Sequence, residues 1–479
     1  MKLPNSSVHR IVTDLQNAEL GGDPRRTRRL KRVVTRMSKR PTASLPDVMD
    51  SEAELKATYR FVNSEHVSMA ALHEAHATQT ADRARREHTV LAIHDTTPCH
   101  CPHGDPADVG YLNTGKPGFY AHYTLLVGAT SRRPLGVSYL ETIVRKKPPR
   151  RRRVRAAKRQ NKSGAQTRKK KNREFARWQR GVTATDARLD GCEVIHVADR
   201  ESDSYELMTG CLQAESRFVF RVRIRERAVI ENGEKGAIHE LAAQAEGILS
   251  REVALATRKP RTAPRAAKSH PPRNARMATL HFSAMQVELC RPRYLGRTFP
   301  PTLKLNVVRV WEPQPPSGEA PVEWLLYTTE PVDTPAQVAA VVDMYRARWL
   351  IEECNKALKS GCLIEQREFQ TREAMMVMLA ISLPIACEIL SLRAGARENP
   401  TRPATDVLRP LQIEILKRVG SRKLGNTPTA RDALLAVAAL GGHQRSNGEP
   451  GWHILQRGMS KLLAYEVGWR AARELPADL

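Results

Sequence analysis

The sequence predicts an α/β fold in the middle of the chain, with a helical segment on either side. Short runs of β-branched and aromatic residues alternate with helical stretches between residues 89 and 225, while residues 1–72 and 371–479 show mainly helical patterns. The 479 residues allow about three domains. We therefore expect a helical domain at 1–72, an α/β domain at 73–370 with a β-rich insertion at about 228–330, and a helical domain at 371–479.

The composition indicates a polyanionic partner. The net charge is +27 and the pI is near 10.1, which suits nucleic acid or an acidic membrane surface. The most apolar segment, residues 374–392, contains Pro384 and Glu388 and predicts a buried helix, and residues 1–16 are too polar for a signal peptide. We therefore expect no membrane. The eight scattered cysteines predict reduced thiols in the cytoplasm.

The N-terminal domain begins with a strong helix signal. Asp23 suits the N-cap and Pro24 the first helical position, and a dense basic stripe follows, formed by Arg25, Arg26, Arg28, Arg29, Lys31 and Arg32. A second helix is expected at Glu52–Val62. The stripe suits a DNA groove or a row of phosphates, although a solvated basic face would show the same residues.

The α/β domain reads as an ordered series of elements. Strands are expected at 89–93, 118–129 and 135–144, a helix at 172–189, a strand at 192–198, a helix at 204–214 and a strand at 217–225. This order is typical of a ribonuclease H-like core, in which carboxylates at strand ends converge on metal ions. Asp95 follows the first strand and Asp199 follows the fourth. Each could instead be an aspartate that forms a turn or caps a helix.

Residues 345–359, YRARWLIEECNKALK, predict one helix, because no Gly or Pro interrupts them. At about 100° per residue, Tyr345, Arg348, Glu352 and Lys359 fall within roughly 60° of one face. Trp349 and Leu350 lie off this stripe and are expected to pack. Glu352 can hold a divalent metal while Arg348 and Lys359 hold an anionic strand, although a surface helix with ordinary salt bridges would fit the same pattern.

Several loops carry further charge or ligand types. Residues 99–103, CHCPH, could ligate zinc but are spaced too tightly for an ordinary site. Residues 145–180 hold eighteen basic residues against one acid, Glu174, which suits a DNA-phosphate clamp better than a nuclear-localisation signal. Residues 258–276 are also basic and Pro-rich, and predict a loop within the insertion.

The spacing Y-x2-R-x3-E-x6-K, together with DTT at 95–97 and DRESD at 199–203, resembles the motifs of the insertion-sequence-four family of bacterial DDE transposases. The resemblance is to its transposon-five-like branch and covers nearly the whole chain. It implies that Asp95, Asp199 and Glu352 hold two Mg²⁺ ions, for which Mn²⁺ is expected to substitute. Tyr345, Arg348 and Lys359 would hold phosphates. Trp324 would stack on a flipped base, although a lone strand Trp is by default a core residue.

The N-terminal motifs GDPRRTRRL and ATYRFV also resemble the end-binding domain of that branch. The resemblance implies DNA contacts by Arg25, Arg26, Tyr59 and Arg60, and we expect Arg29 of the same stripe to join them. The implied partners are double-stranded DNA, both transposon ends and target, and a second protomer that pairs through the C-terminal domain in a synaptic complex. The implied location is the bacterial cytoplasm, on the nucleoid.

These observations predict a cut-and-paste DNA transposase that cleaves its ends through a hairpin and joins the 3′-hydroxyl ends to target DNA. Two rivals remain at this point. A junction resolvase or host ribonuclease could use the same core, and a DNA-binding protein descended from a transposase could act as a repressor or inhibitor without catalysis.

Overall fold

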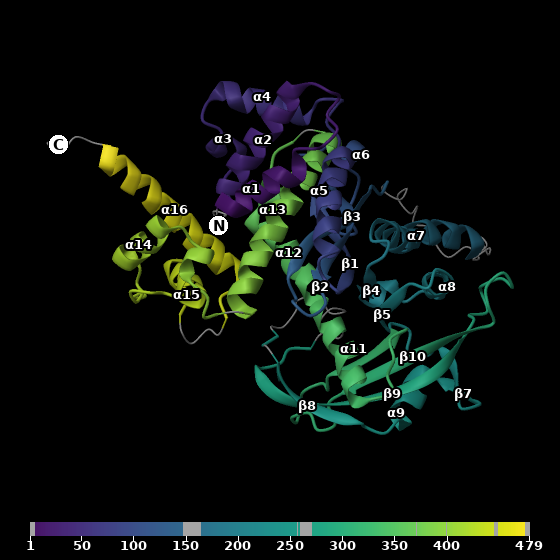
Figure 1. Ribbon diagram of the computed structural model, residues 1–479. Helices are drawn as coiled ribbons and strands as arrows, with labels where there is room; N and C mark the ends of the chain where they lie inside the picture. Colours follow the sequence, from purple (N-terminus) through teal and green to yellow (C-terminus); the bar gives the residue numbers. More distant parts are fainter. Residues whose placement is uncertain are drawn as a thin grey trace, which may run out of the picture.

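A mixed sheet of eleven strands runs through the molecule, with helices on both faces (Figure 1). In Figure 1 the N-terminal helices lie at the top, the C-terminal helices at the left, and strands β7, β8 and β9 at the bottom. The computed structural model describes residues 5–146, 164–255, 257–258, 271–369, 371–398, 400–444 and 449–474. Much of the predicted clamp at 145–180 and of the basic loop at 258–276 lies outside these residues.

The first five strands form the half of the sheet that carries the acidic motifs. They run in the order β3-β2-β1-β4-β5, with β1 parallel to β4 and β4 parallel to β5, and with β2 antiparallel to both β1 and β3. This order is consistent with a ribonuclease H-like core. The bounds are β1 Thr89–His100, β2 Gly118–Gly128, β3 Pro134–Ile143, β4 Glu193–Ala198 and β5 Arg217–Arg221.

The predicted β-rich insertion continues the same sheet. It contributes β6 Ala228–Glu231, β7 Glu234–Ala237, α9 Ile238–Gln244, β8 Leu249–Leu255, β9 Arg276–Cys290, β10 Thr302–Trp311 and β11 Glu323–Thr328. The order continues from β5 as β11-β10-β9-β6-β7, and β8 pairs with β9. The seam between core and insertion is short, since the register of β11 with β5 runs from Leu326 to Thr328, with one further backbone hydrogen bond on either side.

Different helices cover the two faces of the core sheet. On one face, Trp178 of α7 (Gly164–Arg188) packs with Ala198 of β4, and α8 (Tyr205–Gln213) joins the same cluster. On the other face, Ile93 of β1 packs with Ile351 of α12 (Trp349–Lys356). The side chains of β1 alternate between these two environments because successive strand residues point to opposite faces. The short helix α6 (Pro106–Val109) follows β1.

The N-terminal helices follow the predicted signals. They are α1 Asn5–Leu15, α2 Pro24–Lys39, α3 Leu45–Val48, α4 Glu52–Val62 and α5 Met69–Ala84. The predicted N-cap is confirmed, because the Asp23 side chain accepts a hydrogen bond of 2.8 Å from the Arg25 backbone N–H. The bounds predicted for the second helix are those of α4.

The predicted buried helix is confirmed as part of α13 (Arg372–Glu398), which contains Pro384. Its segment Arg372–Ser391 is long and apolar enough to cross a membrane, but 89% of it is buried inside the protein. It is therefore a core helix, and no membrane is indicated. Because α13 packs with the α/β domain while α14 (Pro410–Val419), α15 (Ala430–Leu440) and α16 (Trp452–Glu474) share their own cluster, the packing favours a boundary after α13.

Two local predictions are wrong. The first strand does not end before Asp95, because pairing with β2 extends β1 to the pair His100 and Gly118. Residues 345–359 are not one regular helix: α11 (Pro335–Ala347) ends before Arg348, α12 follows, and Ala357–Gly361 forms a π-helical turn. At the break, Arg348 and Ile351 donate backbone hydrogen bonds to residues three positions earlier, which tightens the turn.

Candidate active site

Asp95 and Asp199 lie side by side at the end of the parallel pairing between β1 and β4. The last paired residues are His94 of β1 and Ala198 of β4, so each aspartate directly follows its partner in the register. β1 continues past this point only with β2, and β4 ends. The two carboxylates therefore occupy the place where the parallel pair opens, although Asp95 itself lies inside a strand.

Their proximity has an electrostatic consequence. Burial, and next the negative charge of Asp199, raise the pKa of the Asp95 carboxyl to about 6. Two like charges held near each other in a partly buried position stabilise any cation that comes between them. A hydrogen bond of 2.8 Å from the Asn355 Nδ2 to Asp95 Oδ2 fixes one oxygen of this carboxylate.

Asp199 also has a structural role. Its Oδ1 accepts a hydrogen bond of 2.8 Å from the Glu201 backbone N–H, so it caps the 3₁₀ turn Arg200–Ser202. The sequence left a capping aspartate open as an alternative, and that alternative is confirmed for this oxygen. A carboxylate has further lone pairs, so the cap does not prevent Asp199 from acting as a ligand.

Glu352 comes from α12, on the face of the sheet where Asp95 lies. It is half-buried, and its Oε1 accepts a hydrogen bond of 2.6 Å from Arg348, one turn earlier in the chain. Burial opposes the charged form of this arginine, but Tyr345, Glu352 and Asp199 together raise the pKa of Arg348. Arg348 is therefore a positive charge that lies among the carboxylates.

These residues fit a divalent cation in part. Among the described residues, no three His, Cys, Asp or Glu side chains stand close enough to hold a metal ion. Asp95 and Asp199 supply hard oxygen donors and mutual repulsion that a cation would relieve, as Mg²⁺ sites require. Glu352 is held in its ion pair with Arg348. The donor chemistry thus fits the ion, and the third carboxylate joins only by sharing or exchanging its arginine.

The other predicted residues of the 345–359 segment lie in different surroundings from one another. Tyr345 is buried at 4% exposure, and its ring lies edge-on to that of Trp324, with centroids 5.7 Å apart. Lys359, in the π-helical turn, pairs with Glu365 at 3.4 Å. Trp349, expected to pack, is instead 53% exposed. Trp324 is half-buried, intermediate between the two readings that the sequence left open.

Two family models match the chain. The model described as a transposase DNA-binding domain matches residues 11–67, and the model described as a transposase DDE domain matches residues 147–385. The chain belongs to the DDE transposases. It is a transposase enzyme with DNA as a partner, and domains of this kind generally use divalent metal ions. The DDE match contains Asp199 and Glu352 and begins after Asp95, whose place beside Asp199 comes from the sheet.

The predicted DNA contacts of this DDE transposase differ in exposure. Arg25 and Arg60 are exposed, and Arg29 is half-buried. Arg26 donates a hydrogen bond of 2.8 Å to the Leu20 carbonyl, and the Tyr59 ring packs edge-on against Phe369 with centroids 6.0 Å apart. Arg26 and Tyr59 therefore already make structural contacts, and Arg25 and Arg60 are the most accessible of the five.

A polar network covers the opposite face of β1 from Asp95. His94 Nε2 lies 2.9 Å from His196 Nδ1, and His196 Nε2 lies 2.7 Å from Asp186 of α7. Arg177, also of α7, donates to Thr96 at 3.0 Å and to Glu201 at 3.2 Å, and so contacts segments next to both aspartates. Because Arg177 belongs to the basic run 145–180, the sequence predicted a phosphate contact for it and not a buried position.

Sequence reasoning also missed Asn355. It stands three positions after Glu352, and that helical spacing on one face could have pointed to it. Its contact with Asp95 was not readable, because the partner lies 260 residues away in the chain.

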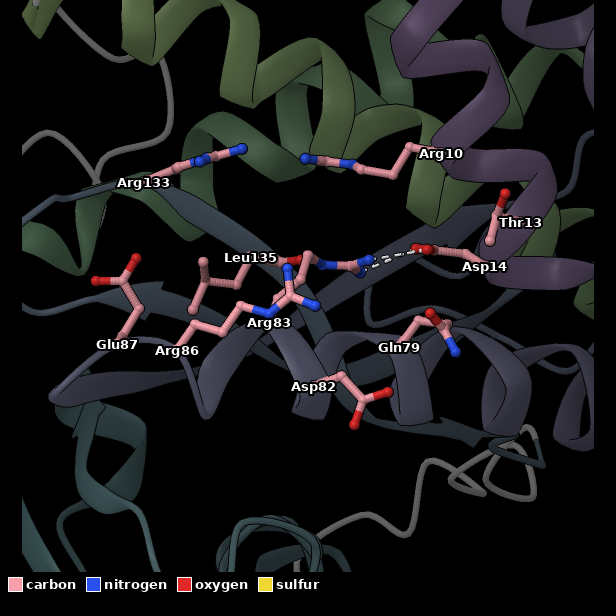
Figure 2. A pocket seen from close by; sticks show the side chains of 10 residues that line it. All are labelled: Arg10, Thr13, Asp14, Gln79, Asp82, Arg83, Arg86, Glu87, Arg133 and Leu135. Carbon is pink, nitrogen blue, oxygen red and sulfur yellow. Dashed lines mark hydrogen bonds and ion pairs between the residues drawn. The ribbon is translucent and has the colours of Figure 1, made fainter.

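A cleft elsewhere in the transposase lies between α1, α5 and the start of β3 (Figure 2). Its volume is about 470 Å³, and none of its lining residues belongs to the carboxylate site. Figure 2 shows Arg83 of α5 directed at Asp14 of α1, and these two form a bidentate pair at 2.8 and 2.9 Å. The cleft is lined by Arg10, Thr13, Asp14, Gln79, Asp82, Arg83, Arg86, Glu87, Arg133 and Leu135. The ion pair between Arg83 and Asp14 indicates that the cleft lies along the contact between α1 and α5.

Proposed function

We propose that this DDE transposase is a cut-and-paste enzyme of the insertion-sequence-four family, in its transposon-five-like branch. It binds the inverted-repeat ends of its element, cleaves them through a hairpin, and joins the 3′-hydroxyl ends to target DNA. Asp95, Asp199 and Glu352 are its metal-holding residues, for two Mg²⁺ ions. The observation that carries this proposal is the adjacency of Asp95 and Asp199 at the opening of β1 and β4, with the helix of Glu352 hydrogen-bonded to Asp95.

The residues around the carboxylates support the roles proposed for them. When bound, the two ions activate the attacking water or 3′-hydroxyl and stabilise the leaving oxygen. Arg348 balances the charge of Glu352 and can turn toward a phosphate, since a guanidinium suits both carboxylate and phosphate. Trp324 is half-buried, with Tyr345 against the edge of its ring and the Arg221 guanidinium 5.9 Å from the ring centroid, and in this proposal its ring stacks on the flipped base. Lys359 reaches DNA in this proposal by leaving Glu365.

The assembly belongs to the same proposal. Two protomers pair in a synaptic complex through the C-terminal helices, with Arg25, Arg26, Arg29, Tyr59 and Arg60 on the transposon ends. The exposed positions of Arg25 and Arg60 favour this role, and the charge of +27 favours association with nucleoid DNA.

The test is incubation of the purified protein with Mg²⁺ and DNA that carries the inverted repeats flanking its own gene. We expect nicks at the repeat ends, then hairpins, then joined products with a target plasmid. Nicking without joining would support a nuclease on the same core instead. Binding to the repeats without cleavage, in Mg²⁺ or Mn²⁺, would contradict the proposed reaction.

A further inference from the structure

Asp95, Tyr123 and Asn355 form a hydrogen-bonded unit that ties the proposed site together. Asp95 of β1 and Tyr123 of β2 are direct partners in the antiparallel register, so their side chains lie on the same face of the sheet. Asn355 of α12 reaches both of them. We propose that Asn355 is a positioning residue for metal binding: it fixes the Asp95 carboxylate and sets the distance between Asp95 and Glu352. This inference rests on the proposed function.

The orientation of the Asn355 amide follows from its two partners. The Tyr123 hydroxyl donates to Asn355 Oδ1 at 2.8 Å, and the amide Nδ2 donates to Asp95 Oδ2 at 2.8 Å. An ionised carboxylate can only accept hydrogen bonds, and the phenol supplies the donor that the amide oxygen needs. Tyr123 is fully buried, so its hydroxyl cannot turn to water. The tyrosine therefore holds the amide with its N–H groups toward Asp95.

The same amide places Glu352. Asn355 and Glu352 are three residues apart in α12 and share a helix face. A hydrogen bond from Asn355 to β1 thus fixes the helix relative to the strand that carries Asp95. Burial of Ile351 and Cys354 already docks α12 on the sheet, but apolar contacts allow sliding that a hydrogen bond to a single oxygen does not. The specific contribution of Asn355 is the register between the two carboxylates.

The experiment measures Mn²⁺ binding to the full chain without DNA, by electron paramagnetic resonance, alongside thermal melting. Asn355→Ala should weaken Mn²⁺ binding about 10–100-fold, as removal of a residue that orients a metal ligand does. Tyr123→Phe keeps the amide but frees its orientation, and should weaken binding about 2–10-fold. Cleavage of DNA ends should fall in the same order and be recovered in part by raised Mg²⁺.

Matched controls come from the same chain. Asn306→Ala removes a half-buried amide that donates to the Glu330 carbonyl at 2.7 Å, and Tyr205→Phe removes a buried hydroxyl that donates to the Pro300 carbonyl at 2.8 Å. Both should lower the melting temperature as much as the test variants do and leave Mn²⁺ binding unchanged. If Asn355→Ala fails to fold, the pair Tyr123→Phe and Tyr205→Phe decides.

Asp95→Asn separates this inference from the proposed function. If the wild-type chain binds no Mn²⁺, or if Asp95→Asn binds it as the wild type does, the proposed metal site is wrong. If Asp95→Asn loses binding while Asn355→Ala and Tyr123→Phe bind Mn²⁺ normally, the metal site stands and the positioning role is overturned. Weakened binding in both test variants, with normal controls, supports the role.

Discussion

The two faces of β1 place polar groups in opposite electrostatic situations. On the face toward α12, burial and the charge of Asp199 raise the pKa of Asp95 to about 6. On the face toward α7, burial lowers the pKa of His94 well below its usual value and that of His122, which pairs with Thr96 from the neighbouring strand β2, to about 3, so both imidazoles are neutral. The α12 face thus holds two neighbouring carboxylates, Asp95 and Asp199, whereas the α7 face holds neutral rings at His94 and His122, which are hydrogen-bonded to Thr124 and Thr96.

This difference makes the faces respond to pH in opposite directions. Because the folded pKa of Asp95 is raised above 3.8, its contribution to stability is complete below 3.8 and is lost as pH rises through about 6. Because the folded pKa of His122 is lowered from 6.5, its contribution is complete above 6.5 and is lost as pH falls toward about 3. Near neutral pH the α7 face is therefore a stable support, while the α12 face carries a repulsion that a cation would relieve.

The largest expected effect is on the α12 face. Asp95→Ala, Asp199→Ala and Glu352→Ala should each reduce strand cleavage by at least about 10³-fold, because each removes a proposed metal ligand. Binding to the transposon ends should change little, which a gel-shift assay with the same DNA would measure. A variant that cleaved at the wild-type rate would remove that residue from the site.

On the α7 face the expected effect is on stability. His94→Ala leaves His196 and Thr124 each short of a hydrogen-bond partner and opens a cavity, and should cost about 2–4 kcal/mol of unfolding free energy. Urea unfolding measures this cost. The wild-type protein should also lose stability as pH falls below 6.5.

The control for the α7 face is the exposed His66, whose change to Ala should cost less than about 0.5 kcal/mol. A normally stable His94→Ala protein would show that the network does not support the sheet.

A smaller effect of opposite sign should come from neutralising the α12 face. In metal-free protein at pH 7.5, Asp95→Asn should raise the free energy of unfolding by about 1–3 kcal/mol, because it removes the cost of burying the Asp95 charge and its repulsion from Asp199. The gain should shrink as pH falls through 6, where the wild-type carboxyl takes up a proton. The matched change at exposed Asp82, which pairs with Arg85, should give no gain. Equal stability at pH 7.5 would contradict the buried charge and the repulsion between Asp95 and Asp199.

Trp324→Ala tests how far the α12 face extends along the sheet. As a stacking residue it should reduce hairpin formation about tenfold or more, since base stacking contributes about 1–3 kcal/mol, while nicking survives. As a core residue it should instead cost about 3–5 kcal/mol of stability. Trp324→Phe should recover part of the hairpin activity. Equal slowing of nicking and hairpin formation, in a protein that melts normally, would rule out base flipping.

The smallest effect lies far from β1, on the basic stripe of α2. Replacing Arg25, Arg26 and Arg29 together by Ala should weaken end binding and reduce the slope of log affinity against log salt by about 1–3, because each phosphate contact releases counterions. Cleavage at saturating protein should be preserved. An unchanged slope would mean that the stripe is only a solvated face.

Local signals carried the successful predictions. Asp23 and Pro24 predicted the start of α2 because capping and the restricted φ of proline act within a few residues. The place of Asp199 directly after a strand was predicted because β4 is a short apolar run that ends at Ala198. Such features need no knowledge of what lies across the sheet.

The failures depended on distant partners. Nothing near Asp95 indicates that β1 continues to His100, because Gly118 and the rest of β2 supply that pairing. The helix break at Arg348 and the exposure of Trp349 have no local signal either, since residues 345–359 contain no Gly or Pro. Arg177 looked like one member of a charge run, and only tertiary packing distinguishes a buried guanidinium from a solvated one.

The short seam between β5 and β11 has a mechanical consequence. Ten paired positions join β9 to β10, but only three join β5 to β11. The neighbouring pairings are longer, with four positions between β4 and β5 and six between β10 and β11, so under load the sheet would yield between β5 and β11 before it yields at either of these. The insertion and the core would then tilt relative to each other about this line. Trp324, two residues before the first pair of the seam, would move with the insertion, while Asp95 and Asp199 would stay with the core.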